Sequence, residues 1–62
     1  MNLTPKETSA RLGVAVQTLA NWRLFGTGPR FLKLGGKILY PLAEIEAFEQ
    51  ANLRESTSQR VG

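Results

Sequence analysis

The chain has 62 residues, a formal net charge of +3, and neither cysteine nor histidine. Its length is near the lower limit for a domain that folds without disulfides or metals. The absence of cysteine and histidine excludes disulfide bonds, Cys/His zinc sites and histidine acid–base chemistry, so we expect no metal or cofactor. Hydrophobic residues make up 42% of the chain and charged residues 21%, which is typical of a globular domain.

No apolar run reaches the length of about 20 residues that a membrane-spanning helix needs. The first seven residues, Met-Asn-Leu-Thr-Pro-Lys-Glu, lack the apolar segment of a secretion signal. We therefore expect a cytoplasmic protein with no membrane partner.

Charge is unevenly distributed along the chain. Residues 1–40 carry six basic side chains and one acidic side chain, whereas residues 41–53 carry three glutamates and no basic residue. This asymmetry predicts a basic face that attracts phosphates. The alternative is an ordinary surface of mixed charge.

Capping signals predict a first helix that begins after Thr4. Thr4 can cap the helix, Pro5 suits the first helical position, and Glu7 completes a capping box three residues after the cap. Thr8 and Leu12, one helical turn apart, are expected on the buried face, and the helix should end near Leu12.

Residues 12–25 predict a corner between two helices. Gly13 suits the left-handed position that ends a helix, and Val14 can fill the corner. A second helix is expected over residues 16–25, with its inner face formed by Val16, Leu19, Trp22 and the stem of Arg23. Two helices joined by a short turn with glycine form the helix-turn-helix pattern, which presents its second helix to DNA.

The outer face of this second helix carries Gln17 and Asn21, with Thr18 at its edge. Both amides can make paired hydrogen bonds to adenine, and both can also reach phosphates. The alternative is two solvated amides on a surface helix. Within a helix-turn-helix corner, we favour the interpretation in which they face DNA.

Leu24 and Phe25 close the second helix with an apolar pair. If exposed, the pair would indicate a protein-interaction module, because small helical domains dock partners through such surfaces. We instead expect the pair to pack beneath the following hairpin or the third helix.

A β-hairpin is predicted after a break at residues 26–29. Residues 31–34 and 37–40 are rich in branched and aromatic side chains and flank Gly35-Gly36, where both glycines suit the positive φ angles of a type I′ turn. Such a hairpin is the wing of a winged helix. Its basic residues are expected near phosphates or in a minor groove, and they are Arg30, Lys33 and Lys37.

Pro41 is expected to end the second strand, and residues 42–52 predict a third helix. Its core-closing residues should recur every third position, as Leu42, Ile45, Phe48 and Ala51. Its glutamates are interpreted as a solvated face. Residues 54–62 have no hydrophobic period, so we expect a domain over residues 1–53 followed by a flexible tail over residues 54–62.

The order of these motifs resembles the excisionase/AlpA-type winged-helix family, which is related to the DNA-binding head of the MerR regulators. The similarity covers residues 3–50 and rests on the segments Leu3-Thr4-Pro5-Lys6-Glu7, Arg11-Leu12-Gly13-Val14, Thr18-Leu19-Ala20-Asn21-Trp22-Arg23, Gly26-Thr27-Gly28-Pro29-Arg30-Phe31-Leu32-Lys33-Leu34-Gly35, Ile38-Leu39-Tyr40 and Glu44-Ile45-Glu46-Ala47-Phe48.

The resemblance implies a mainly α winged helix-turn-helix with three short helices and a two-stranded wing. It implies that the second helix enters a major groove and that the wing reaches an adjacent minor groove or its backbone. The implied DNA contacts come from Gln17, Thr18 and Asn21 on the helix, from Arg23 as a phosphate anchor, and from Gly36 and Lys37 at the wing turn. The chain departs from the family at Ala15, where a Ser or Thr cap is usual, and in the wing turn, where arginines are common.

These features point to a sequence-specific double-stranded DNA-binding protein of a phage or mobile element. The leading hypothesis is an excisionase that binds and bends attachment-site DNA, contacts an integrase and binds in tandem copies. It would act on the nucleoid in a bacterial cytoplasm. The alternatives are a small AlpA-like transcriptional regulator and, less favoured, the interaction module. No small-molecule effector is expected, and an enzyme is the least expected class because no catalytic set can be assembled.

Overall fold

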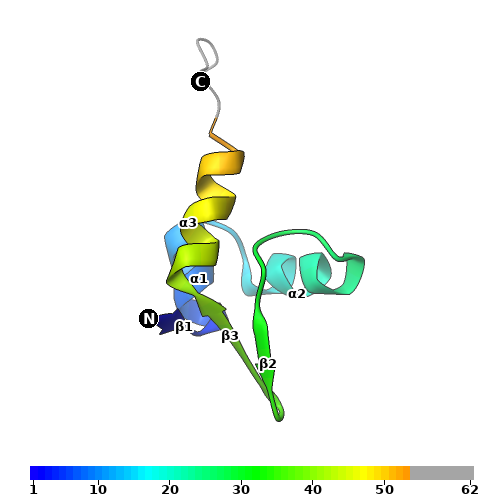
Figure 1. Ribbon diagram of the computed structural model, residues 1–62. Helices are drawn as coiled ribbons and strands as arrows, with labels where there is room; N and C mark the ends of the chain where they lie inside the picture. The colour runs from blue at the N-terminus through cyan, green and yellow to red at the C-terminus, as the bar shows by residue number, and fades with distance from the viewer. Residues whose placement is uncertain (54–62) are drawn as a thin grey trace.

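Three short helices and a small antiparallel sheet make up residues 1–53, the part of the chain that this computed structural model describes. The elements follow in the order β1 (Asn2–Leu3), α1 (Pro5–Leu12), α2 (Val16–Phe25), β2 (Leu32–Leu34), β3 (Lys37–Pro41) and α3 (Leu42–Ala51). The β2–β3 hairpin projects as an arm, while α3 carries the chain away from the hairpin tip (Figure 1). This arrangement confirms the predicted winged helix-turn-helix. The predicted tail over residues 54–62 lies outside the described residues.

The start of α1 has the predicted capping box. The backbone N–H of Glu7 donates to Thr4 Oγ1 at 3.1 Å, and the backbone N–H of Thr4 donates to Glu7 Oε1 at 2.9 Å. Thr8 is fully buried, and its hydroxyl donates to the carbonyl of Thr4 at 2.9 Å. Gly13 ends the helix in the left-handed conformation, with φ of 73°. The capping box at Thr4 and the glycine at residue 13 therefore set the two ends of α1.

The second helix spans the predicted residues and starts without a side-chain cap at Ala15. The burial of its side chains differs from the prediction at both ends of the helix. Val16 was expected on the inner face but is 45% exposed, whereas Val14 in the turn packs against the core. Leu24 and Phe25 are 76% and 74% exposed, so the expectation that they pack beneath the hairpin or α3 is wrong. The hairpin meets α2 at Arg23, which leaves the outer side of the last turn uncovered.

The sheet has three strands rather than the predicted two. Its order is β1-β3-β2, and β1 pairs with β3 through Asn2 opposite Pro41 and Leu3 opposite Tyr40. The backbone N–H of Leu42 also donates to the carbonyl of Met1 at 2.7 Å. A two-residue strand is too short to show alternation in a sequence, which explains why the prediction missed it.

The hairpin turn differs from the predicted type I′ geometry. Gly35 has φ of 63°, whereas Gly36 is not in the positive-φ region. A positive φ at the first central residue alone is the pattern of a type II′ turn, which also matches the twist of the strands. The requirement for glycine therefore falls on Gly35, and the expected positive φ at Gly36 is wrong.

The fully buried hydrophobic core consists of Leu19, Tyr40 and Ile45, one residue each from α2, β3 and α3. Partly buried side chains surround these three residues, namely Leu3, Leu12, Val14, Trp22 and Ile38. Ala51 is exposed and does not help to close the core, because it lies at the last turn of α3, beyond the sheet. No helix within residues 1–53 is long and apolar enough to cross a membrane.

Candidate nucleic-acid interface

The outer face of α2 presents two amides next to each other. Gln17 and Asn21 are both exposed, and Gln17 Nε2 donates to Asn21 Oδ1 at 3.2 Å. This contact holds the two side chains together while leaving further donors and acceptors on each amide for another molecule. Thr18, at the edge of this face, is partly buried. The structure therefore brings two of the three predicted helix contacts together on the surface.

Arg23 lies on a different side of α2 and turns inward. Its Nη1 donates to the hydroxyl of Tyr40 at 2.8 Å, and its Cζ lies 5.8 Å from the centre of the Phe31 ring. Phe31 and Tyr40 are themselves in contact, with ring centres 6.0 Å apart. The role of Arg23 as a phosphate anchor stays a prediction, and the contact with Tyr40 was not foreseen because nothing in the local sequence pairs the two residues.

The basic residues of the wing are exposed but do not form one cluster. In the strand register Lys33 lies opposite Ile38, and Lys37 lies opposite Leu34. Directly opposed residues share a face and successive residues alternate, so Lys33 and Lys37 lie on opposite faces of the hairpin. Lys33 shares the face of Tyr40, which contacts α2. Arg30 precedes β2 and is also exposed.

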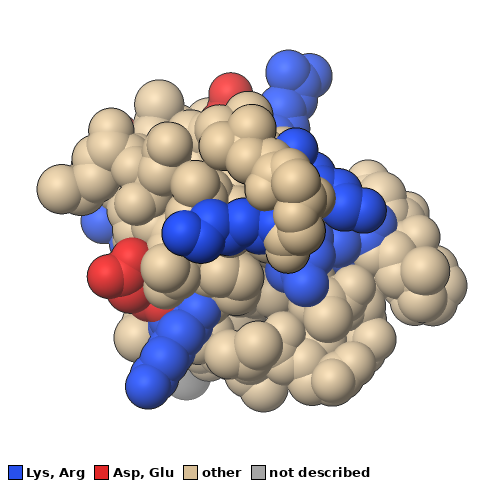
Figure 2. Space-filling model, turned by 90° about the horizontal axis from the view of Figure 1, so that it is seen from below, with Lys and Arg blue, Asp and Glu red and all other residues tan. Residues whose placement is uncertain are grey.

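Positive charge gathers on the side of the molecule from which the hairpin projects. Figure 2 views this end and shows lysine and arginine side chains across its centre, with acidic side chains at its margin. Such a distribution attracts the phosphate backbone of a nucleic acid without specifying its sequence.

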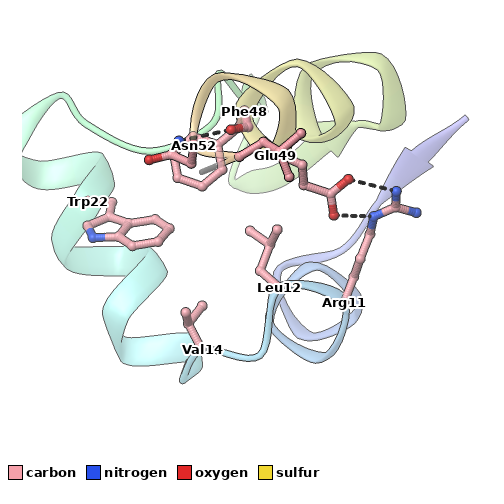
Figure 3. Close-up of a pocket in the computed structure, with 8 residues that line it drawn as sticks. Arg11, Leu12, Val14, Trp22, Phe48, Glu49 and Asn52 are labelled. Carbon is pink, nitrogen blue, oxygen red and sulfur yellow. Dashed lines mark hydrogen bonds and ion pairs between the residues drawn. The ribbon is translucent and has the colours of Figure 1, made fainter. Parts of the chain in front are cut away.

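A hollow lies between the helix corner and α3. Trp22 and Phe48 line it with tilted rings that contact each other, with centres 5.4 Å apart, and Leu12 and Val14 also line it (Figure 3). At its edge the guanidinium of Arg11 donates two hydrogen bonds of 2.9 Å to the carboxylate of Glu49. These bonds hold the pKa of Glu49 below its ordinary value. One of the three glutamates of α3 is therefore paired, which the sequence pattern did not reveal.

Comparison with known proteins identifies the family. Residues 3–53 match the family model described as a helix-turn-helix domain, which covers nearly all of the described chain. This match confirms the resemblance to the excisionase/AlpA-type family. No curated protein and no solved structure matches the chain. The chain therefore belongs to the helix-turn-helix domain family and is a small DNA-binding protein.

Proposed function

We propose that the protein is an excisionase of a phage or mobile element, which binds and bends attachment-site DNA. In this proposal α2 lies in a major groove, with Gln17 and Asn21 directed at base edges and Thr18 beside them. The observation that carries the proposal is the exposed amide pair on the second helix of a helix-turn-helix domain, next to a basic hairpin. Amides recognise adenine by paired hydrogen bonds, so the pair supports sequence-specific reading.

The two faces of the hairpin suggest how the wing would be used. A hairpin placed at a minor groove has a phosphate backbone on each side, and that groove is about 6 Å wide in B-DNA. Lys33 and Lys37 lie on opposite faces, so each could reach a different backbone strand. Neither contact requires the wing to enter the groove deeply, which fits a turn made of two glycines and no arginine.

The proposed mechanism is architectural. The protein would bind a short site, in tandem copies where the site repeats, and bend the DNA towards an integrase. Its place of action would be the nucleoid in a bacterial cytoplasm, because that is where such DNA lies. The alternative within the same class is a small AlpA-like transcriptional regulator, since both activities need only DNA binding.

The test combines footprinting with a recombination assay. The purified protein is footprinted on DNA from its own locus. Where that locus encodes an integrase, attachment-site junctions are then quantified in cells that express the integrase with or without this protein. An excisionase protects sites beside the junction and raises the excised product. Protection of a promoter alone, with unchanged junctions, would instead identify the regulator.

One observation favours the alternative of a protein-interaction module. Leu24 and Phe25 remain exposed at the end of α2, and neighbouring exposed apolar side chains are common in interaction surfaces. A gel shift with random duplex DNA separates the two functions. A pure interaction module leaves the duplex unshifted even at low salt.

A further inference from the structure

Arg23 is a basic residue on the second helix that is directed into the protein. The hydroxyl of Tyr40, a residue that is 1% exposed, accepts its hydrogen bond at 2.8 Å. A buried tyrosine hydroxyl needs a partner, and here α2 supplies it from across the fold. The guanidinium also lies 5.8 Å from the Phe31 ring centre, within the range of a cation–π contact.

We refer to Arg23, Tyr40 and Phe31 as the Arg23 bridge. Its residues come from α2, from the central strand β3 and from the segment just before β2. Within residues 1–53, the Arg23–Tyr40 contact is the only hydrogen bond that joins α2 to the hairpin. The bridge therefore connects the two elements that the proposed function assigns to DNA.

The tip of the hairpin lies far enough from this bridge to magnify small rotations. Lys37 is three residues from Tyr40 along β3. At about 3.3 Å per residue the separation is about 10 Å. A rotation of about 20° between α2 and the hairpin then moves the tip by about 3 Å, which is enough to break a hydrogen bond to a phosphate.

We propose that Arg23 is a positioning residue, which fixes the angle between α2 and the wing so that both elements engage one duplex together. The inference rests on DNA binding through both elements. It differs from the role of Arg23 as a phosphate anchor in one measurable respect. A phosphate anchor works without Tyr40, whereas a positioning residue needs the tyrosine hydroxyl.

The main test removes that hydroxyl alone. Tyr40→Phe keeps the buried ring, and its affinity is measured by fluorescence anisotropy on a labelled duplex from the protein's own locus, with and without Lys37→Ala. Lys37→Ala in the wild-type background should lower affinity about 5- to 10-fold at about 0.1 M salt, the effect of one lost phosphate contact. In the Tyr40→Phe background it should cost less than about 2-fold, because the wing is no longer held in place.

Thr8→Val is the matched control. It also removes one buried hydroxyl and one hydrogen bond at nearly constant volume, but that bond joins Thr8 to Thr4 at the start of α1 and does not involve the wing. Lys37→Ala should keep its full effect in this background. If Lys37→Ala costs as much in Tyr40→Phe as in the wild type, or has no effect in the wild type, the proposal is wrong.

Arg23→Met provides a second variant, which keeps the apolar stem and removes the guanidinium. For a phosphate anchor, Arg23→Met and Lys37→Ala each reduce the salt slope by about one unit and their effects add. For a positioning residue, the double variant has the same slope as Lys37→Ala alone. Additive slopes therefore contradict the proposal.

A measurement on the free protein distinguishes this proposal from the proposed function. Residual dipolar couplings report the orientation of α2 relative to the hairpin in the wild type and in whichever of Tyr40→Phe and Arg23→Met folds. The angle between α2 and the hairpin should change, or its distribution should widen. The couplings within each element should still fit the structure of that element. An unchanged orientation contradicts the positioning role of Arg23. Failure of the wild type to bind any duplex at low salt overturns the proposed function instead.

Discussion

At the level of single residues, the two faces of α2 differ in burial. Leu19 is fully buried, whereas Gln17 and Asn21 are exposed and have each other as their side-chain partner. Removing either amide leaves no cavity in the core. A change on this face is therefore expected to alter DNA binding without altering folding.

Asn21→Ala and Gln17→Ala should each weaken specific binding and leave the melting temperature nearly unchanged. A lost pair of hydrogen bonds to a base costs about 1–3 kcal/mol of discrimination. Trp22→Ala should instead destabilise the domain by about 3 kcal/mol, because the indole packs on Phe48 and on the core. Affinities on cognate and random duplexes, together with thermal melts, test both expectations. A large drop in melting temperature for Asn21→Ala but not for Trp22→Ala would show that the buried and exposed faces of α2 are assigned the wrong way round.

Gly28 should be sensitive to the smallest substitution. Its φ is +81°, and a Cβ there would lie 2.7 Å from Cε3 of Trp22. Gly28→Ala therefore combines backbone strain with a clash against a packed ring, and we expect a loss of about 1–3 kcal/mol in the free energy of unfolding. Gly36→Ala is the control, since nothing lies within 4 Å of its Cβ position and its φ is not positive. Equal melting temperatures for the two variants would contradict this expectation.

At the level of elements, the hairpin depends on one glycine more than on the other. Gly35 occupies the first central position of the turn with φ of 63°. Gly35→Val should damage the wing more than Gly36→Val, because a β-branched residue rarely adopts positive φ. NMR cross-strand contacts between β2 and β3 provide the measurement. Loss of these contacts only in Gly36→Val would indicate a different turn.

Lys37→Ala should weaken binding to cognate and unrelated duplexes about equally. Phosphate contacts position a protein on DNA but do not specify a sequence. The salt slope should fall by about one unit. If Lys37→Ala loses discrimination while Asn21→Ala loses affinity uniformly, then the wing reads the sequence and α2 only anchors.

The elements that carry strong local signals were predictable from the sequence. The capping box at Thr4, the glycine at residue 13 and the apolar spacing around Leu19 locate α1 and α2 to the residue. Contacts between distant segments were not predictable. The pairing of Leu3 with Tyr40, the ion pair between Arg11 and Glu49 and the Arg23 bridge join residues far apart in the chain, and periodicity carries no information about such pairs.

The exposed end of α2 shows a different limit. A helical wheel describes which side chains share a side, but it does not describe how far the neighbouring elements extend. Leu24 and Phe25 are exposed because the core contacts of α2 are made through Leu19 and Trp22. The candidate site was predictable only in part. The helical period placed Gln17 and Asn21 side by side, but the sequence analysis did not assign Lys33 and Lys37 to opposite faces of the hairpin.

At the level of the whole molecule, charge is unevenly distributed among the elements. Basic side chains gather on the side of the hairpin, and the glutamates of α3 lie on the helix that leads away from it (Figures 1 and 2). Such a dipolar arrangement orients the approach of the protein to a polyanion.

Duplex binding should therefore depend on salt with a modest slope. About three to five basic groups can reach one duplex, so the plot of log K against log salt should have a slope of about −3 to −4.5. Anisotropy titrations from low to moderate salt provide the measurement. A slope near zero, or no binding at low salt, would contradict an electrostatic interface on this side.

The attachment of α2 through a single fully buried residue affects how the protein can evolve. Four exposed positions share its outer side, namely Gln17, Asn21, Leu24 and Phe25. Substitutions there do not disturb Leu19, Tyr40 or Ile45, so preference for a target can drift in single steps while the scaffold tolerates each intermediate. The same tolerance makes these positions suitable for a combinatorial library, from which variants with new targets can be selected on an unchanged fold.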